Sequence, residues 1–217
     1  MIKNDYTSIM LNELYITLDK LKKLKKEKNL DKSMNLINDS LKQFLGLRFE
    51  TIDILPYKDL MSIISSSGKI NIGKSIILSE LLKEKANLYE LKGESIKSFN
   101  IYIKSLNILI ELILRENKLC TQEFFSKIDD IIDITEQYEL PLYSKSLLFE
   151  YYEVKGEYSR AEDMIFEILD KNNDNKEIIN KAKDFYERLK CKSEEELEKG
   201  NLPLDEVLDG LNQLNNF

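Results

Sequence analysis

The sequence predicts an all-α protein built from repeated helix hairpins, and three observations lead to this prediction. Residues 89–94 (YELKGE) recur 63 residues later as residues 152–157 (YEVKGE). Each copy lies between two stretches with the apolar spacing of a helix, so each glycine is expected at the turn of a hairpin. No stretch shows the alternation of a strand. Repetition of a hairpin is typical of a helical solenoid, a fold that mostly presents a binding surface.

Apolar periodicity predicts about ten helices in order along the chain. They lie at residues 5–26, 31–45, 57–65, 74–92, 95–116, 122–138, 142–155, 158–171, 176–190 and 204–214, with a short helical turn near 194–198. The stretch 95–116 is rich in isoleucine, but about twenty residues without Gly or Pro favour a buried helix over a strand. No linker is long enough to divide the chain, so one domain is expected over residues 1–217.

Helix ends are marked by few residues. The prolines each precede an amphipathic stretch and are predicted to start helices: Pro56, Pro141 and Pro203. Gly46 and Gly200 are expected just past helix ends, in the left-handed conformation. Ser193 and Glu196 have the spacing of a capping box, in which side chain and backbone satisfy each other's free groups.

Composition narrows the class of protein. The formal net charge of −7 argues against nucleic-acid binding, which needs clustered Lys and Arg. The longest apolar run, residues 101–114, is interrupted by charges and too short to span a bilayer. The first residues do not resemble a signal peptide, so none is expected. Cys120 and Cys191 form no disulfide or metal-binding pattern, and histidine is absent. We therefore expect a cytoplasmic protein without membrane, metal or cofactor, from an AT-rich bacterial genome.

One motif fits a chemical function. From Gly68 to Ser75 the chain satisfies the phosphate-loop pattern, in which backbone amides hold phosphates and Lys74 would reach the terminal ones. A phosphate loop sits on a parallel sheet, and no further strand is visible. A loop that begins a helix explains the same residues. Residues 170–175 imitate the start of a calcium loop, but Lys181 stands where a bidentate Glu is required.

Two further patterns concern surfaces. The basic run over residues 20–28 fits an anionic partner, but it also lies at a helix C-terminus, where cations stabilise the helix dipole, and we favour that interpretation. The C-terminal stretch carries an apolar helix stripe of Leu204, Val207, Leu208, Leu211 and Leu214. It is predicted to cap the last hairpin or, if exposed, to contact a partner or a second copy.

Two hairpins resemble tetratricopeptide repeats. The matching positions are Leu82, Ala86, Tyr89, Gly93, Ser98, Tyr102 and Ser105 in one hairpin, and Leu148, Tyr152, Gly156, Tyr158 and Ala161 in the other. An eroded third copy fits Leu24, Leu30, Ser33, Ile37 and Ser40. Phe149 and Ile168 replace small residues of the repeat and its closing Pro is missing, so the resemblance implies a short, irregular solenoid.

The whole chain is also similar to an uncharacterised bacterial family known as a domain of unknown function, which implies no activity. This likeness is carried by residues 3–6, 138–141, 156–163 and 202–203.

The repeat resemblance implies a concave groove lined by the first helix of each hairpin. Its candidate residues are Glu80, Lys83, Glu84, Asn87, Glu90, Tyr143, Ser146, Glu150 and Glu153. The Lys/Asn/Arg clamp that the repeats use for a C-terminal carboxylate is absent, and an acidic lining favours a basic or neutral ligand. The plainer interpretation is that these are solvated Glu side chains in i,i+4 pairs.

These observations predict a non-enzymatic module that binds a protein or peptide, with a homo-oligomer left open. No catalytic residue is assigned. Two alternatives stay open: a regulatory sensor of a small ligand or peptide, and nucleotide binding from Gly68 to Ser75.

Overall fold

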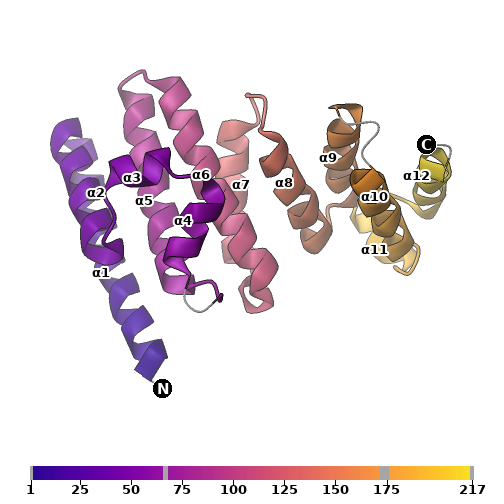
Figure 1. The fold of residues 1–217 in the computed structure, drawn as a ribbon, viewed down its shortest axis with the longest axis horizontal. Coiled ribbons are helices and arrows are strands. Elements are labelled where there is room, and N and C mark those ends of the chain that lie inside the picture. The colour runs from indigo at the N-terminus through magenta and orange to yellow at the C-terminus, as the bar shows by residue number, and fades with distance from the viewer. Residues whose placement is uncertain (1, 66–67, 172–175, 216–217) are drawn as a thin grey trace. The chain divides into compact units, whose positions relative to one another are not determined.

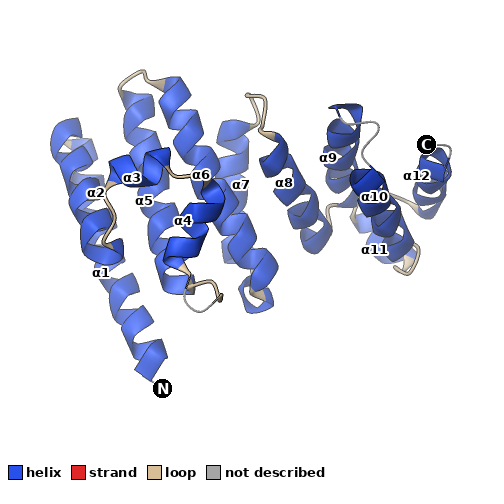
Figure 2. Cartoon of the chain, viewed as in Figure 1, coloured by secondary structure: helices blue, strands red, loops and turns tan. Residues whose placement is uncertain are grey.

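The chain is helical throughout the part that the computed structural model describes, which is residues 2–65, 68–171 and 176–215 (Figures 1 and 2). These residues form twelve α-helices and one short 3-10 helix, and they contain no strand. The all-α prediction is therefore confirmed. The chain divides into two compact units, Met1–Gln137 and Tyr138–Phe217, where the sequence led us to expect one domain. Each unit is described by itself.

The first unit contains seven α-helices. They are α1 (Ile2–Lys26), α2 (Leu30–Leu45), α3 (Phe49–Ile54), α4 (Tyr57–Ile64), α5 (Ile72–Leu91), α6 (Ser95–Arg115) and α7 (Gln122–Thr135), with the 3-10 helix η1 (Asn117–Leu119) before α7. Helices α5 and α6 form the central hairpin, with α1 and α2 against one side of α5 and α7 against α6 (Figure 1).

The second unit contains five helices around a smaller core. They are α8 (Leu142–Lys155), α9 (Tyr158–Lys171), α10 (Lys176–Leu189), α11 (Glu194–Lys199) and α12 (Leu204–Asn215). Helices α8 and α9 form its hairpin, and α10 packs against both α9 and α12.

Small side chains let α5 and α6 approach each other closely. The Ser98 hydroxyl donates to the Ala86 carbonyl at 2.9 Å, and the Ser105 hydroxyl donates to the Ser79 carbonyl at 2.8 Å. Because α6 is enclosed in this way, nearly all of its residues from Ile101 to Ile113 are buried. Its isoleucine-rich sequence therefore reflects a buried helix, as the length of the run predicted.

Helix α3 is the element that the sequence did not predict. Its six residues span less than two turns and give no apolar period, and no side chain caps its start. Tertiary contacts hold it instead, because Phe49 and Ile52 are buried and the Lys104 ammonium of α6 donates to the carbonyls of Ile52, at 2.8 Å, and Asp53. Lys104 thus satisfies carbonyl groups that the end of a short helix leaves unpaired.

The glycines of the recurring motif make the same turn in both units. Gly93 and Gly156 have φ angles of 76° and 84°, in the left-handed region that ends a helix. Gly46 ends α2 in the same way, with φ of 70°. The hairpin turns predicted from the repeated motif are confirmed.

Gly200 lies just past the end of α11, as predicted, but the predicted left-handed conformation is wrong. Its φ is −82°, and the left-handed residue at this turn is Asn201, with φ of 54°. A side chain at Gly200 would clash with the ring of Tyr158 and would lie 2.8 Å from the Gly156 carbonyl oxygen. Glycine stands here because the α8–α9 turn comes too close for a Cβ atom, which is a packing requirement that local sequence does not reveal.

The other end signals act nearly as expected. Pro56 and Pro141 directly precede α4 and α8 and occupy the N-cap, one position before the expected one, and Pro203 precedes α12. Ser193 and Glu196 form the predicted capping box, with the Ser193 amide donating to Glu196 Oε2 at 3.1 Å.

Three of the five residues in the predicted apolar stripe of the C-terminal helix are buried. Val207, Leu211 and Leu214 are buried, whereas Leu204 and Leu208 are exposed. These buried residues face Tyr186 of α10, which is also fully buried. The Tyr186 hydroxyl donates to Glu162 Oε1 of α9 at 2.5 Å. Gly210 lets α12 approach this ring, since a Cβ atom there would lie 2.7 Å from Tyr186 Cε1.

Replacing Gly210 by Ala is therefore expected to loosen α12. Alanine favours a helix by about 1 kcal/mol over glycine, but overpacking against a buried ring costs about 1–3 kcal/mol. We expect a net loss of about 1 kcal/mol, measured as faster hydrogen exchange of the α12 amides. The control is Asn212→Ala on the exposed side of α12, which should slow exchange; slower exchange in both variants would contradict the packing argument.

Candidate functional site

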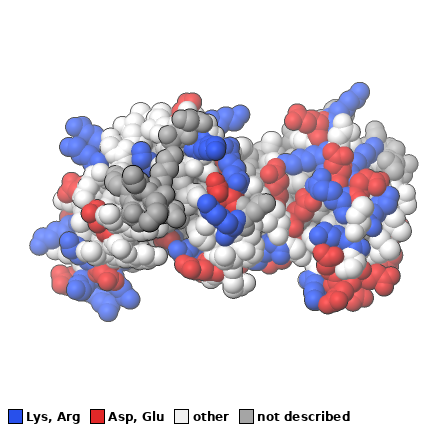
Figure 3. Space-filling view, turned by 90° about the horizontal axis from the view of Figure 1, so that it is seen from below, with Lys and Arg blue, Asp and Glu red and all other residues white. Residues whose placement is uncertain are grey.

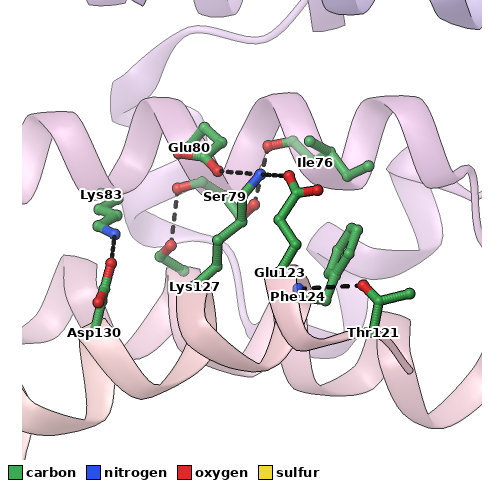
Figure 4. A network of polar contacts seen from close by, with 10 residues as sticks. Ile76, Ser79, Glu80, Lys83, Thr121, Glu123, Phe124, Lys127 and Asp130 are labelled. Atoms are coloured by element: carbon green, nitrogen blue, oxygen red, sulfur yellow. Dashed lines mark hydrogen bonds and ion pairs between the residues drawn. The ribbon is translucent and has the colours of Figure 1, made fainter. Parts of the chain in front are cut away.

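The predicted groove residues of α5 form ion pairs with two neighbouring helices. Glu84 pairs with Lys25 of α1 at 2.5 Å. On the other side of α5, Lys83 pairs with Asp130 of α7 at 3.3 Å. Figure 4 shows this second side, with α5 and α7 side by side and the charged side chains pointing toward each other. We call this surface of α1, α5 and α7 the α5 face.

Lys127 of α7 joins two carboxylates on the α5 face (Figure 4). Its ammonium lies 3.4 Å from Glu80 and 3.5 Å from Glu123. Burial lowers the pKa of Lys127. The carboxylates of Glu80 and Glu123 and the side chain of Tyr15 raise this pKa by a larger amount, so the net shift is upward. Lys127 therefore stays charged, and Tyr15 of α1 lies within the same electrostatic environment.

The last two predicted residues of α5 contact α6 instead. Asn87 Oδ1 accepts from the Tyr102 hydroxyl at 2.9 Å, and burial together with nearby carboxylates raises the pKa of Tyr102 to about 12. Glu90 accepts from the Ser95 hydroxyl at 3.4 Å. These contacts hold the two helices of the hairpin together.

The predicted residues of α8 show the same arrangement in the second unit. Lys181 of α10 donates to Glu150 at 2.6 Å and to the Ser146 hydroxyl at 3.2 Å. Arg188 of α10 donates through two nitrogens to the two oxygens of Glu153, at 2.6 and 2.8 Å. This hydrogen-bonded pair raises the pKa of Arg188. Together with the exposed ring of Tyr143, this surface of α8 and α10 is the α8 face.

The glutamates of both faces are thus paired with cations of other helices. Glu80, Glu84, Glu150 and Glu153 each contact a Lys or Arg that lies far away in the sequence. The interpretation as i,i+4 pairs does not hold for these four. Figure 3 shows one side of the molecule, where positive and negative side chains lie interspersed over much of the surface. The acidic lining inferred from α5 and α8 alone is therefore largely compensated within the chain.

The phosphate-loop pattern is a helix start in the structure. Helix α5 begins at Ile72, inside the motif, and Asn71 is its N-cap, with Oδ1 accepting from the Lys74 amide at 3.1 Å. The helix α4 precedes the loop where a strand is required, and Ser75 is buried. Residues 66 and 67 lie outside the described part of the chain. The plainer interpretation of this motif explains its geometry.

The described residues hold no cluster of three or more potential metal ligands, and the resemblance to a calcium loop falls on residues 172–175, outside the described part. Within the same limits no helix combines the length and apolarity needed to cross a bilayer. Cys120 is partly buried, and this burial raises the pKa of its thiol, which disfavours the reactive thiolate. Cys191 is exposed.

The protein is thus an all-helical protein whose hairpins carry faces of internally paired charges. Comparison with known sequences identifies its family. A family of unknown function, DUF6483, matches residues 1–217, and the chain belongs to this family. This agrees with the predicted similarity to an uncharacterised family. Comparisons with curated proteins and with solved structures find no significant match.

Proposed function

We propose that this chain is a non-enzymatic module that binds a protein or peptide across the α5 face, with the α8 face as a second contact surface. The observation that carries the proposal is the row of paired charges across α1, α5 and α7, together with Tyr15 of α1, which is 57% exposed. An exposed aromatic ring next to ordered polar groups is the composition of a binding hot spot. The helix-hairpin architecture supports the same function, since such hairpins mostly present surfaces.

The ion pairs make the α5 face a suitable template. Because Lys25 is held by Glu84, and Lys127 by Glu80, a ligand does not bear the full cost of ordering these long side chains. The pairs also offer both hydrogen-bond donors and acceptors without a large net charge. Of the basic and neutral ligands expected from the sequence, the pairing favours a neutral peptide with an apolar side chain to pack on Tyr15.

Several packing features support a tetratricopeptide-like origin of the two hairpins. The small residues Ala86, Ser98 and Ser105 lie where α5 and α6 approach, as the repeat pattern implies. Glycines end the first helix of both hairpins, and the candidate groove residues lie on these first helices. We include a tetratricopeptide-like binding mode and a cytoplasmic, bacterial setting in the proposal.

Affinity capture from a lysate of the source organism, analysed by mass spectrometry, tests the proposal. We expect the wild-type chain to retain a discrete partner that Tyr15→Ala loses. The double variant Lys25→Glu/Glu84→Lys keeps an ion pair but reverses its direction, so it should retain the fold and reduce capture. Ile96→Ala, which truncates an exposed side chain at the α5–α6 turn, should capture normally. Equal capture by all four proteins would contradict binding at the α5 face.

One feature favours the second candidate, a sensor of a small ligand. A depression of about 470 Å³ lies where the α1–α2 turn meets the end of α5, lined by Glu27, Lys28, Asn29, Leu30, Asp31 and Lys92. A ligand that binds there would raise the melting temperature of the chain in proportion to the logarithm of its concentration. A screen of small polar metabolites by thermal shift, with Lys92→Ala as the unresponsive control, measures this directly.

A further inference from the structure

A stripe on the outer side of α1 combines apolar and basic side chains. Ile9 and Ile16 are both 56% exposed and lie seven residues apart, which places them on one side of the helix. Lys20 and Lys23 continue this side toward the C-terminus, both exposed and without an ion pair among the described residues. We call these four residues the α1 stripe. It spans about 21 Å at 1.5 Å per residue.

A second stripe, on α12, has the complementary chemistry. Leu204 and Leu208 are 38% and 42% exposed, although the other apolar residues of this helix are buried. Asp205 and Asp209 follow each leucine by one position, so an exposed pair of carboxylates runs beside the leucines. Neither aspartate forms an ion pair within the described part of the chain. These four residues are the α12 stripe, which spans about 8 Å along the helix at 1.5 Å per residue.

The two units also differ in net charge, with the acidic excess on the unit that contains α12. Residues 1–137 carry 21 Lys and Arg against 20 Asp and Glu, whereas residues 138–217 carry 11 against 19. The net charge of −7 therefore arises almost wholly from the second unit. A second copy of this chain brings an acidic surface that an unpaired basic stripe attracts.

We propose that the α1 stripe of one copy docks on the α12 stripe of a second copy. Isoleucine packs against leucine in this contact, and Lys20 and Lys23 approach Asp205 and Asp209. The two lysines and the two aspartates form no ion pair before docking, within the described part of the chain. Because a single helix pair buries less surface than a standard interface, the association is weak, with a dissociation constant of roughly 10–100 µM. It uses residues outside the α5 face and is independent of the proposed function.

Sedimentation velocity of the full chain, from micromolar to several hundred micromolar, tests the proposal. We expect association that grows with concentration and weakens about tenfold when 0.5 M salt screens the charges. A monomer over the whole concentration range would overturn the proposal. Association that strengthens with salt would overturn it too, because the contact would then be apolar without charge pairing.

Charge reversal provides the sharper test. Lys20→Glu/Lys23→Glu and Asp205→Lys/Asp209→Lys should each weaken self-association about tenfold or more, because each leaves like charges facing each other. Mixing the two variants should restore association, since each then meets an oppositely charged stripe. The control Lys58→Glu/Lys69→Glu makes the same change in net charge as Lys20→Glu/Lys23→Glu, at exposed sites elsewhere. It should weaken association less than Lys20→Glu/Lys23→Glu does. Failure of the mixture to associate would overturn the docking of these two stripes.

Discussion

Replacing Phe149 by Ala is expected to destabilise the second unit by about 3–5 kcal/mol. Phe149 stands where a tetratricopeptide repeat has a small residue, so the repeat pattern alone suggests that alanine is tolerated there. In the structure the ring is fully buried between α8 and α10 and meets Phe185 edge to face, with 5.2 Å between ring centroids. The Lys181 ammonium lies 5.2 Å from its centre. The extra volume fills space that a regular repeat does not have.

Urea-induced unfolding, followed by hydrogen exchange in peptides from residues 142–189, measures this loss in the unit concerned. The control is Val154→Ala on the exposed side of α8, which should change stability by less than about 0.5 kcal/mol. Because Lys181 also pairs with Glu150, the Phe149 variant should disturb the α8 face as well. A loss below about 1 kcal/mol would show that alanine fits, and that the departure from the repeat has no structural cause.

Replacing Lys85 by Met is expected to remove most of a rise of stability with pH. Lys85 of α5 is buried, with its ammonium 2.5 Å from Asn38 Oδ1 and 3.6 Å from the centre of the Phe49 ring. No carboxylate forms an ion pair with it among the described residues. Burial lowers the pKa of Lys85 from 10.5 to about 8, although Glu50 and Asp53 act in the opposite direction. The amine is therefore costly to bury in its charged form.

The sign of the effect follows from this lowered pKa. Below about pH 8 Lys85 is protonated in both states, and the folded chain bears the cost of the buried charge. Between pH 8 and 10.5 the folded chain releases the proton while the unfolded chain keeps it, so stability rises with pH. We expect the free energy of unfolding of the first unit to rise by about 2 kcal/mol between pH 7.5 and 9.5.

Chemical denaturation at a series of pH values checks this rise, most of which Lys85→Met should remove. Lys104, whose pKa burial also lowers, contributes in the same direction and leaves a smaller slope in the variant. Lys83→Met is the matched control, because Lys83 lies on the same helix and pairs with Asp130 at the surface. A rise of unchanged size in Lys85→Met would assign the titration to another group.

The helices could be predicted from the sequence because each long one carries its own periodic signal. Residues 95–116 show this best, since a long apolar run without Gly or Pro is sufficient to indicate a buried helix. Helix α3 could not be predicted, because its stability comes from Lys104, which lies about fifty residues further along the chain. The role of Gly200 depends likewise on Tyr158, a contact with no local pattern.

The acidic residues of the candidate site could be predicted from the sequence, but their basic partners could not. Alignment to the repeat placed Glu84 and Glu150 on the first helices of hairpins, and both lie there. Their partners Lys25 and Lys181 come from α1 and α10, so their pairing depends on how the helices pack. An acidic groove was expected because each helix was considered alone, whereas the structure shows a surface of paired charges. Tyr15 was missed for the same reason, since α1 was not included in the groove.

Photo-crosslinking from position 15 is the most direct test of the central claim that the α5 face binds a partner. A photoreactive phenylalanine analogue replaces Tyr15 in one protein and Ile96 in a second, and both are irradiated in lysate. Both side chains are exposed in the first unit, but only Tyr15 acts electrostatically on Lys127 of the α5 face. We expect a discrete crosslinked protein or peptide from position 15 and none from position 96. The same products from both positions, or products from position 96 alone, would contradict the proposed binding face.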